Sequence, residues 1–152
     1  MYVARALQLG RPLALSLQHL GRRETLFELL SHMFSALLIA GEIQEARATG
    51  KELYDLALRL DAGKLYTVLD AMALLACKER SYEAAARIVV CADAAHEAHG
   101  QALRRAAEER IRTAVTAILD ERLSPSCYEE VKGRHEPLDE ARACALALGL
   151  WA

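Results

Sequence analysis

The strongest constraint on the fold is the spacing of the apolar residues, which recur every three or four positions along the chain. Between residues 24 and 40, one such set comprises Leu26, Leu29, Leu30, Met33, Phe34, Leu37 and Leu38. The segments 42–60, 64–77 and 81–100 repeat the spacing. This period is that of an α-helix with one buried face. The pattern therefore predicts helices over these four segments.

The composition favours the same fold class. Ala and Leu occur 29 and 26 times, whereas Val and Ile together occur 11 times. Ala and Leu lead the helix-propensity ranking, while strands favour β-branched and aromatic side chains. No window of 18 uncharged apolar residues occurs, so we expect no membrane span and no membrane partner. We predict one all-α domain over residues 1–152.

The helices are arranged in pairs that resemble one another. Residues 41–46 (Gly-Glu-Ile-Gln-Glu-Ala) align with residues 80–85 (Arg-Ser-Tyr-Glu-Ala-Ala) at a separation of 39. Each copy has a turn residue, a large apolar residue two positions later, and a small Ala at which two helices can cross closely. Such a period is typical of a tetratricopeptide-like α-α superhelix. An incomplete first copy is expected at Gly10 and Pro12, with Pro12 in the first turn of a helix reaching Leu20.

The last third of the chain is predicted to cap these repeats. A long helix is expected over residues 101–122, a short one from Ser124-Pro125 to about Gly133, and a final one starting at Pro137. A solenoid needs terminal elements that cover its last apolar face. We therefore expect helix-pair repeats in residues 1–100 and capping helices in residues 101–152.

The run from Tyr82 to Leu148 contains a series of recognisable pieces. They are residues 82–87 (Tyr-Glu-Ala-Ala-Ala-Arg), His99-Gly100, the Arg- and Ala-rich helix that follows, Gly133, residues 137–141 (Pro-Leu-Asp-Glu-Ala) and Ala145-Leu146. With these pieces the run resembles the C-terminal tetratricopeptide-like part of large bacterial transcriptional regulators of the signal-transduction ATPase (STAND) type. In that family a nucleotide-binding module precedes the repeats, and a LuxR-type or winged-helix DNA-binding domain lies elsewhere. The resemblance implies a non-catalytic domain for protein interaction or effector sensing in signal transduction.

Charge and motifs exclude several other functions. The formal net charge is −2, so the chain lacks the basic character expected for direct nucleic-acid contact. It has no GxxxxGK[ST] phosphate loop and no basic recognition helix, and we expect neither catalysis nor a cofactor. The densest basic stretch alternates with Glu108 and Glu109 and is predicted to be a solvated helix face; its arginines are Arg104, Arg105, Arg110 and Arg112.

The four cysteines indicate a reducing compartment. Cys77, Cys91, Cys127 and Cys144 form no CxxC pair and no zinc-type spacing. Free cysteines are among the most buried residue types. Buried thiols in the cytoplasm are the expected state.

Small polar residues predict where a partner would bind. In a solenoid, the first helix of each pair usually lines the concave surface, and its outward side chains contact the partner. The outward positions form two sets, one per pair: Glu28, Ser31, His32 and Ser35, then Thr67, Asp70 and Lys78. They suit a protein or peptide, or a small effector.

Two alternatives remain open from the sequence. His96 and His99, with Asp93, lie at helical spacing on one face and could bind a metal with one further ligand, in a small helical metal protein or enzyme. The apolar residues of segment 1–20 leave homo-oligomerisation as another possibility.

Overall fold

The computed structural model describes residues 2–60, 62–100 and 104–150, and the chain divides into two compact units, Met1–Ala62 and Gly63–Ala152. All regular structure in the described ranges is helical, which confirms the all-α prediction. No helix in these ranges is long and apolar enough to cross a membrane.

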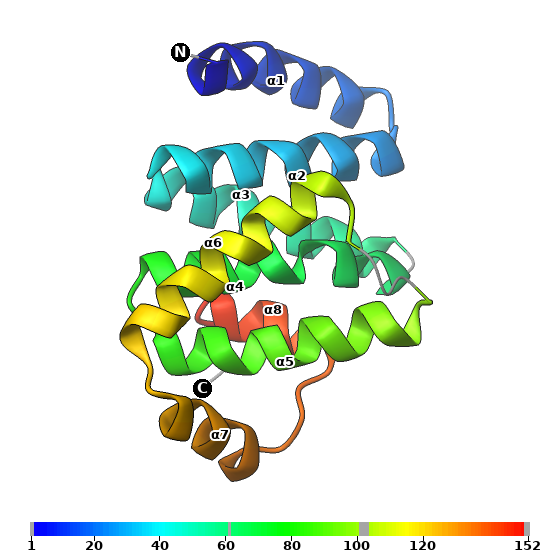
Figure 1. Ribbon diagram of the computed structural model, residues 1–152. Coiled ribbons are helices and arrows are strands. Elements are labelled where there is room, and N and C mark those ends of the chain that lie inside the picture. Colours follow the sequence, from blue (N-terminus) through cyan, green and yellow to red (C-terminus); the bar gives the residue numbers. More distant parts are fainter. Residues whose placement is uncertain (1, 61, 101–103, 151–152) are drawn as a thin grey trace. The chain divides into compact units, whose positions relative to one another are not determined.

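The first unit contains three successive helices, α1 (Tyr2–His19), α2 (Arg23–Ala40) and α3 (Ile43–Arg59) (Figure 1). The middle helix, α2, packs against both α1 and α3. Its buried face is the one predicted from the apolar spacing with two exceptions, since Leu29 is half-buried and Phe27, which is not in the predicted set, is buried. Opposite it, α3 presents the fully buried Ala46, Leu53 and Ala57. Small side chains at such contacts let two helix backbones approach each other.

The prediction that a helix starts at Pro12 is wrong, because α1 runs through Gly10 and Pro12 without interruption. Pro12 is exposed, so the loss of its backbone N–H and the bulk of its ring affect only the solvent side of the helix. Gly10 serves packing instead of a turn, since a Cβ atom there would lie 3.0 Å from Sδ of Met33 on α2. The neighbouring leucines Leu9, Leu13, Leu15 and Leu20 are exposed, and homo-oligomerisation through this helix stays a prediction.

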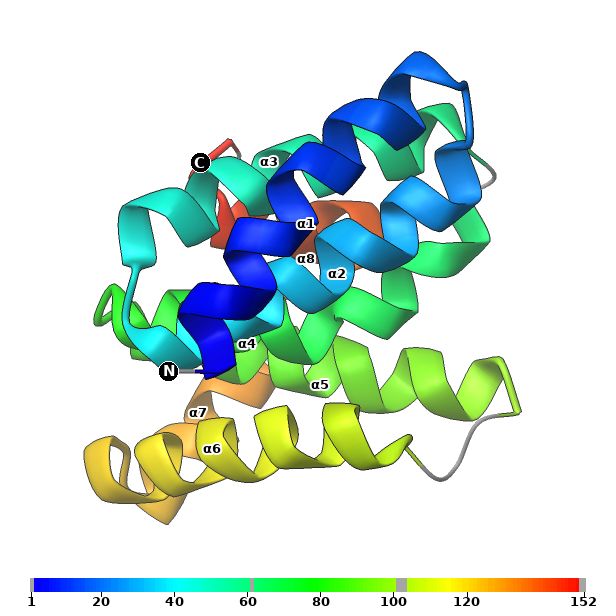
Figure 2. The ribbon, with the colours of Figure 1, turned by 90° about the horizontal axis from the view of Figure 1, so that it is seen from above.

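The second unit is built around a helical hairpin. A 3₁₀ segment, η1 (Ala62–Val68), leads into α4 (Leu69–Lys78), which pairs with α5 (Tyr82–Ala98). Three further helices follow, α6 (Ala106–Arg122), α7 (Pro125–Arg134) and α8 (Glu140–Ala147). All three pack on the hairpin, and α6 and α8 lie on opposite sides of it (Figures 1 and 2).

The hairpin helix α4 is the core of this unit. Every residue from Leu69 to Cys77 is buried, and seven of the nine are Leu, Ala or Met. A helix that is apolar on all sides needs neighbours on all sides, and α5, α6 and α8 contact it from different directions. Asp70 is the one charged residue in this buried run.

One of the predicted helix starts follows the expected capping chemistry. The Ser124 hydroxyl accepts a hydrogen bond from the backbone N–H of Cys127 (3.2 Å), with Pro125 in the first turn. The last helix begins later than predicted. Asp139 is its N-cap and accepts from the N–H of Arg142 (2.7 Å), whereas Pro137 precedes the helix. An Asp side chain can satisfy a free N–H of the first turn, which a Pro ring cannot.

The turns inside the two helix pairs share one backbone geometry. Gly41 and Arg80 are both left-handed, with φ of 81° and 63°. The following residues, Glu42 and Ser81, have nearly equal angles (φ −81°, ψ 68° and φ −92°, ψ 65°). In each turn the N–H of that following residue donates to a carbonyl five positions earlier, at 3.0 and 2.8 Å. Ser81 occupies the N-cap position, but its side chain makes no capping hydrogen bond.

This geometry predicts opposite effects of two substitutions. Left-handed backbone is unfavourable for residues with a Cβ atom and free of that cost for Gly, so Arg80→Gly should raise the free energy of unfolding by about 1 kcal/mol. Gly41→Ala, the matched change in the other turn, should lower it by a similar amount. Urea unfolding followed by circular dichroism measures both. A destabilised Arg80→Gly variant would contradict the assignment.

Candidate functional site

The candidate site begins with the buried carboxylate of Asp70, in the first turn of α4. Its side chain is only 3% exposed and is held by two arginines. Arg104 donates from Nε to Oδ2 at 2.6 Å, and Arg112 lies 3.3 Å from Oδ1 through Nη1. A buried carboxylate without such partners would be strongly destabilising. The two arginines therefore account for the presence of a charge in an apolar helix.

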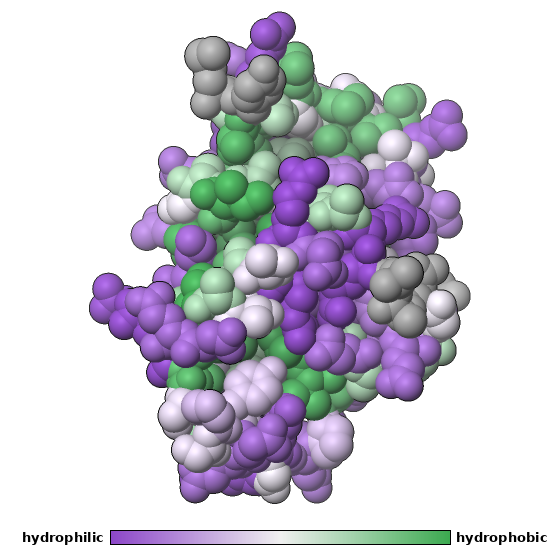
Figure 3. Space-filling model, in the orientation of Figure 1, coloured by the Kyte–Doolittle hydropathy of each residue, from purple (hydrophilic) through white to green (hydrophobic). Residues whose placement is uncertain are grey.

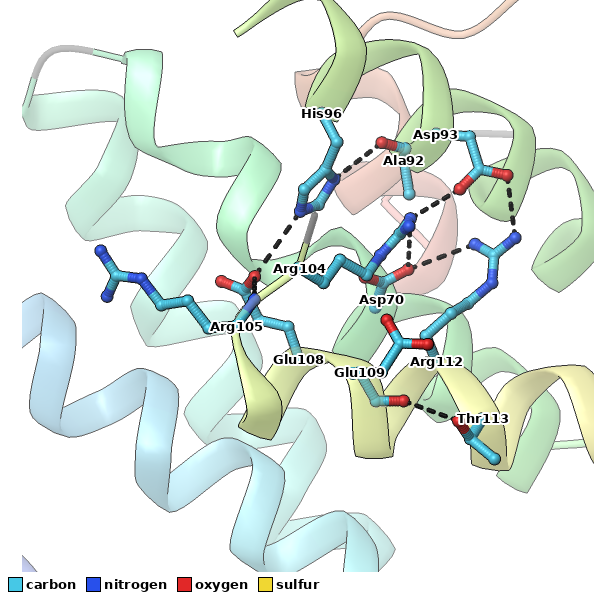
Figure 4. A network of polar contacts seen from close by, with 10 residues as sticks. All are labelled: Asp70, Ala92, Asp93, His96, Arg104, Arg105, Glu108, Glu109, Arg112 and Thr113. Carbon is cyan, nitrogen blue, oxygen red and sulfur yellow. Dashed lines mark hydrogen bonds and ion pairs between the residues drawn. The ribbon is translucent and has the colours of Figure 1, made fainter. Parts of the chain in front are cut away.

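Asp93 on α5 closes the arrangement into a ring of four residues. The Nη2 atom of Arg104 donates to Asp93 Oδ1 at 2.6 Å, and Nη2 of Arg112 donates to Oδ2 at 2.8 Å. Each arginine thus bridges both carboxylates, as Figure 4 shows. We call Asp70, Asp93, Arg104 and Arg112 the ion-pair ring. It joins α4, α5 and α6, and its formal charges cancel.

The electrostatics of the ring follow from its partial burial. For Arg104, burial lowers the pKa, but the hydrogen bonds and negative charges of Asp70 and Asp93 more than offset this, so the pKa is raised above its ordinary value. The prediction that Arg104 and Arg112 belong to a solvated helix face is wrong, because their side chains are only 12% and 17% exposed. Arg105 and Arg110 are exposed as expected.

The proposed metal-binding residues do not converge on one point. His96 is buried, and its Nδ1 lies 2.8 Å from the carbonyl oxygen of Ala92. His99 instead stacks on Tyr66 and lies 3.1 Å from Glu140. Asp93 points into the ion-pair ring. Across the ranges that the structure describes, no group of three His, Cys, Asp or Glu residues could hold a metal ion, so these ranges give the metal-site alternative no support.

The buried His96 has one nitrogen without a hydrogen bond. Since Nδ1 donates to Ala92, Nε2 is the acceptor nitrogen in the neutral ring. Its nearest charged neighbour is Glu108, whose Oε2 atom lies 3.7 Å away. That same oxygen accepts the backbone N–H of Arg105 at 3.1 Å, so Glu108 also caps α6. His96 therefore lies beside the start of α6 (Figure 4).

The residues predicted to bind a partner fall into different environments. On α2, Glu28 and His32 are exposed, while Ser31 and Ser35 are half-buried on the same side of the helix. The Ser31 hydroxyl donates to the carbonyl of Phe27. These four residues are hereafter the α2 polar face.

The residues of the second predicted set, Thr67, Asp70 and Lys78, lie in different environments. The Thr67 hydroxyl donates to the carbonyl of Lys64, within η1, and Lys78 is exposed at the end of α4. Asp70 is not a solvent-facing residue, because α4 is enclosed and its carboxylate is occupied by the ion-pair ring.

A groove that the sequence reasoning missed lies beside the ring, between α5, α6 and α7. It has a volume of about 410 Å³. On α6 its wall contains Arg112, Thr116 and Asp120, which are spaced by four residues and so share one face. The other lining residues are mainly apolar or aromatic, and include Val89, Leu119, Leu123, Pro125 and Tyr128. The four-residue spacing was the available sequence signal, but nothing in it indicates that α7 folds back to enclose a space.

Comparisons of the chain with protein-family models, with curated proteins and with solved structures gave no match.

The ion-pair ring predicts unequal costs for its two carboxylates. Asp70→Asn should lower the free energy of unfolding by about 3 kcal/mol, because it removes the negative charge at the buried end of the ring. Asp93→Asn should cost about 1 kcal/mol or less, since Asp93 is half exposed and water can hydrate the arginine groups that lose its charge. Urea unfolding of both variants measures the difference. Equal costs would show that the burial of Asp70 is not what makes the ring important.

The thiols predict selective alkylation. Burial raises the pKa of Cys77 and of Cys91 to about 11 and raises that of Cys144 as well. Only the thiolate reacts quickly, so iodoacetamide at pH 8 should label the half-buried Cys127 first. In denaturing urea all four cysteines should react. Mass spectrometry of proteolytic peptides identifies the alkylated cysteines. Rapid labelling of Cys144 in the folded protein would contradict its burial.

Proposed function

We propose that the chain is a non-catalytic helical-repeat domain that binds a protein or peptide. It is built of tetratricopeptide-like helix pairs and belongs to a cytoplasmic signalling protein. The family resemblance supports a transcriptional regulator of the bacterial ATPase type. In such a regulator this domain would sense a partner or effector and pass the signal to DNA-binding and ATPase parts.

The observation that carries the proposal is the repeated turn. The α2–α3 and α4–α5 turns each have one left-handed residue, Gly41 and Arg80, and the same backbone hydrogen bond, 39 residues apart. Five residues after each left-handed position stands an Ala with no exposed surface, Ala46 and Ala85. The same backbone hydrogen bond also follows Gly21, between α1 and α2, but there Leu26 stands five positions later. The combination of turn and crossing Ala is therefore what the two pairs share. This combination supports a helix-pair repeat, and stacked helix pairs are widely used as binding surfaces.

The C-terminal helices support the capping role expected in such a domain. α6, α7 and α8 all pack on the α4–α5 hairpin. Gly100, one of the residues that carry the family resemblance, is left-handed (φ 69°) directly after α5. Asp139, from the Pro-Leu-Asp-Glu-Ala segment, is the N-cap of α8.

The α2 polar face is the binding surface that we propose. Its members recur at intervals of three and four residues, opposite the buried face of α2, so they form one stripe along the helix. Hydroxyl, imidazole and carboxylate groups along a helix can hydrogen-bond an extended peptide or a loop. Since Asp70 is occupied by the ion-pair ring, we do not include the α4 set in this surface.

A peptide library displayed on phage tests the proposal. Selection on the wild-type protein should enrich related sequences. These peptides should bind Glu28→Arg/His32→Glu at least about tenfold more weakly, a loss of about 1.4 kcal/mol. Both positions are exposed, so the variant should fold normally.

The matched control carries the same kinds of charge change on α3. Lys51→Glu/Glu52→Arg also alters two exposed residues and should bind the peptides as the wild type does. The proposal fails if no sequence is enriched, or if the enriched peptides bind all three proteins equally.

A further inference from the structure

We propose that the groove between α5, α6 and α7 is a binding site for a small organic cation with an apolar body, such as an aralkylamine. The site involves none of the residues of the α2 polar face, so the inference goes beyond the peptide-binding proposal and does not depend on it. Three properties carry it, namely the apolar floor, the charge of the rim and the aromatic side wall.

The floor of the groove can accept an apolar group. Val89 and Leu119 are only 2% and 3% exposed and lie at its base, and Leu123 and Pro125 extend the apolar lining where α6 passes into α7. In Figure 3 a hydrophobic area lies between the polar surface of α6 and that of α7. A volume of about 410 Å³ falls in the range of small-molecule sites, which are mostly apolar with a few polar groups.

The charges at the groove favour a cation over an anion. Arg112 is the basic residue in the lining, and its terminal nitrogens are paired with Asp70 and Asp93. Asp120 and Glu129 supply two carboxylates. Glu129 lies 3.2 Å from Lys132, whereas the carboxylate of Asp120 has no ion pair or hydrogen bond with any residue in the described ranges. A ligand ammonium group would therefore gain an uncompensated carboxylate, and a ligand carboxylate would find no free cation.

Tyr128 adds an aromatic wall on which a cation can rest. The ammonium group of Lys132 lies 4.8 Å from the centre of this ring, so the ring already makes one cation–π contact within the protein. Burial raises the pKa of Tyr128, so its phenol stays neutral and can donate or accept a hydrogen bond. Asp120 lies two helical turns beyond Arg112, about 12 Å along α6. The acidic end of the groove is thus well separated from the ion-pair ring.

Three probes of similar size and different charge test the site. They are 3-phenylpropylamine, the neutral 3-phenylpropanol and the anionic 3-phenylpropionate, each titrated into the full chain and followed by amide NMR spectra. The amine should shift the signals of Thr116, Asp120, Leu123 and Tyr128 in a saturable way. It should bind at least about tenfold more tightly than the alcohol, and the carboxylate should bind most weakly. No saturable shift with any probe, or equal binding of all three, would overturn the proposal.

Three variants locate the interaction. Asp120→Asn should weaken binding of the amine about fivefold or more and leave the alcohol unchanged. Glu121→Gln is the matched control, since it removes a neighbouring exposed carboxylate that does not line the groove. Thr116→Trp, at an exposed position on the groove wall, should block all three probes by filling the space. An unchanged amine affinity in Asp120→Asn, or equal losses in Asp120→Asn and Glu121→Gln, would contradict a site built on Asp120.

Discussion

The arrangement of the second unit depends on compensation of the Asp70 charge. Because α4 is buried from Leu69 to Cys77, a carboxylate on it must find cationic partners from other elements. Those partners come from Arg104, just before α6, and from Arg112 within it. Both also bind Asp93 on α5, so the same contacts that neutralise Asp70 orient α6 on the hairpin. Hydrophobic packing alone, which is non-directional, would not select this orientation.

The ion-pair ring also determines the charge of the neighbouring groove. Arg112 lies in both features, and its terminal nitrogens are committed to Asp70 and Asp93. Its positive charge is thus offset where it would otherwise attract anions. Of the two carboxylates at the other end, Glu129 pairs with Lys132, whereas the Asp120 carboxylate has no ion pair within the described ranges. The preference for a cation therefore follows from how the buried charge of α4 is neutralised, and a ligand in the groove would contact the helix that the ring holds in place.

The helices were largely predictable from the sequence, whereas the site was not. Periodic apolar residues define a helix locally, so α2, α3, α5 and α7 begin and end within two residues of the expected positions. The expected helix at 64–77 begins instead as the 3₁₀ segment η1. The helix α1 continues through Pro12. In these two places long-range packing and solvent exposure outweighed the local sequence signals. The ion-pair ring joins residues as far as 42 positions apart. No local pattern shows that Asp70 is enclosed, and therefore none shows that two arginines must approach it.

The two helix pairs share the backbone geometry of their turn, whereas the surroundings of their polar side chains differ. Gly41 and Arg80 adopt the same backbone, although only Gly does so without steric cost. The turn geometry thus persists even with an unfavourable residue, as expected where packing of the paired helices imposes it. Packing does not impose the same environment on the polar side chains of the first helix in each pair. Those of the α2 polar face are at least partly accessible, whereas Asp70 on α4 is used for internal neutralisation. Two helix pairs can therefore share one turn geometry while the polar residues of the first helix stay accessible in one pair and are neutralised internally in the other.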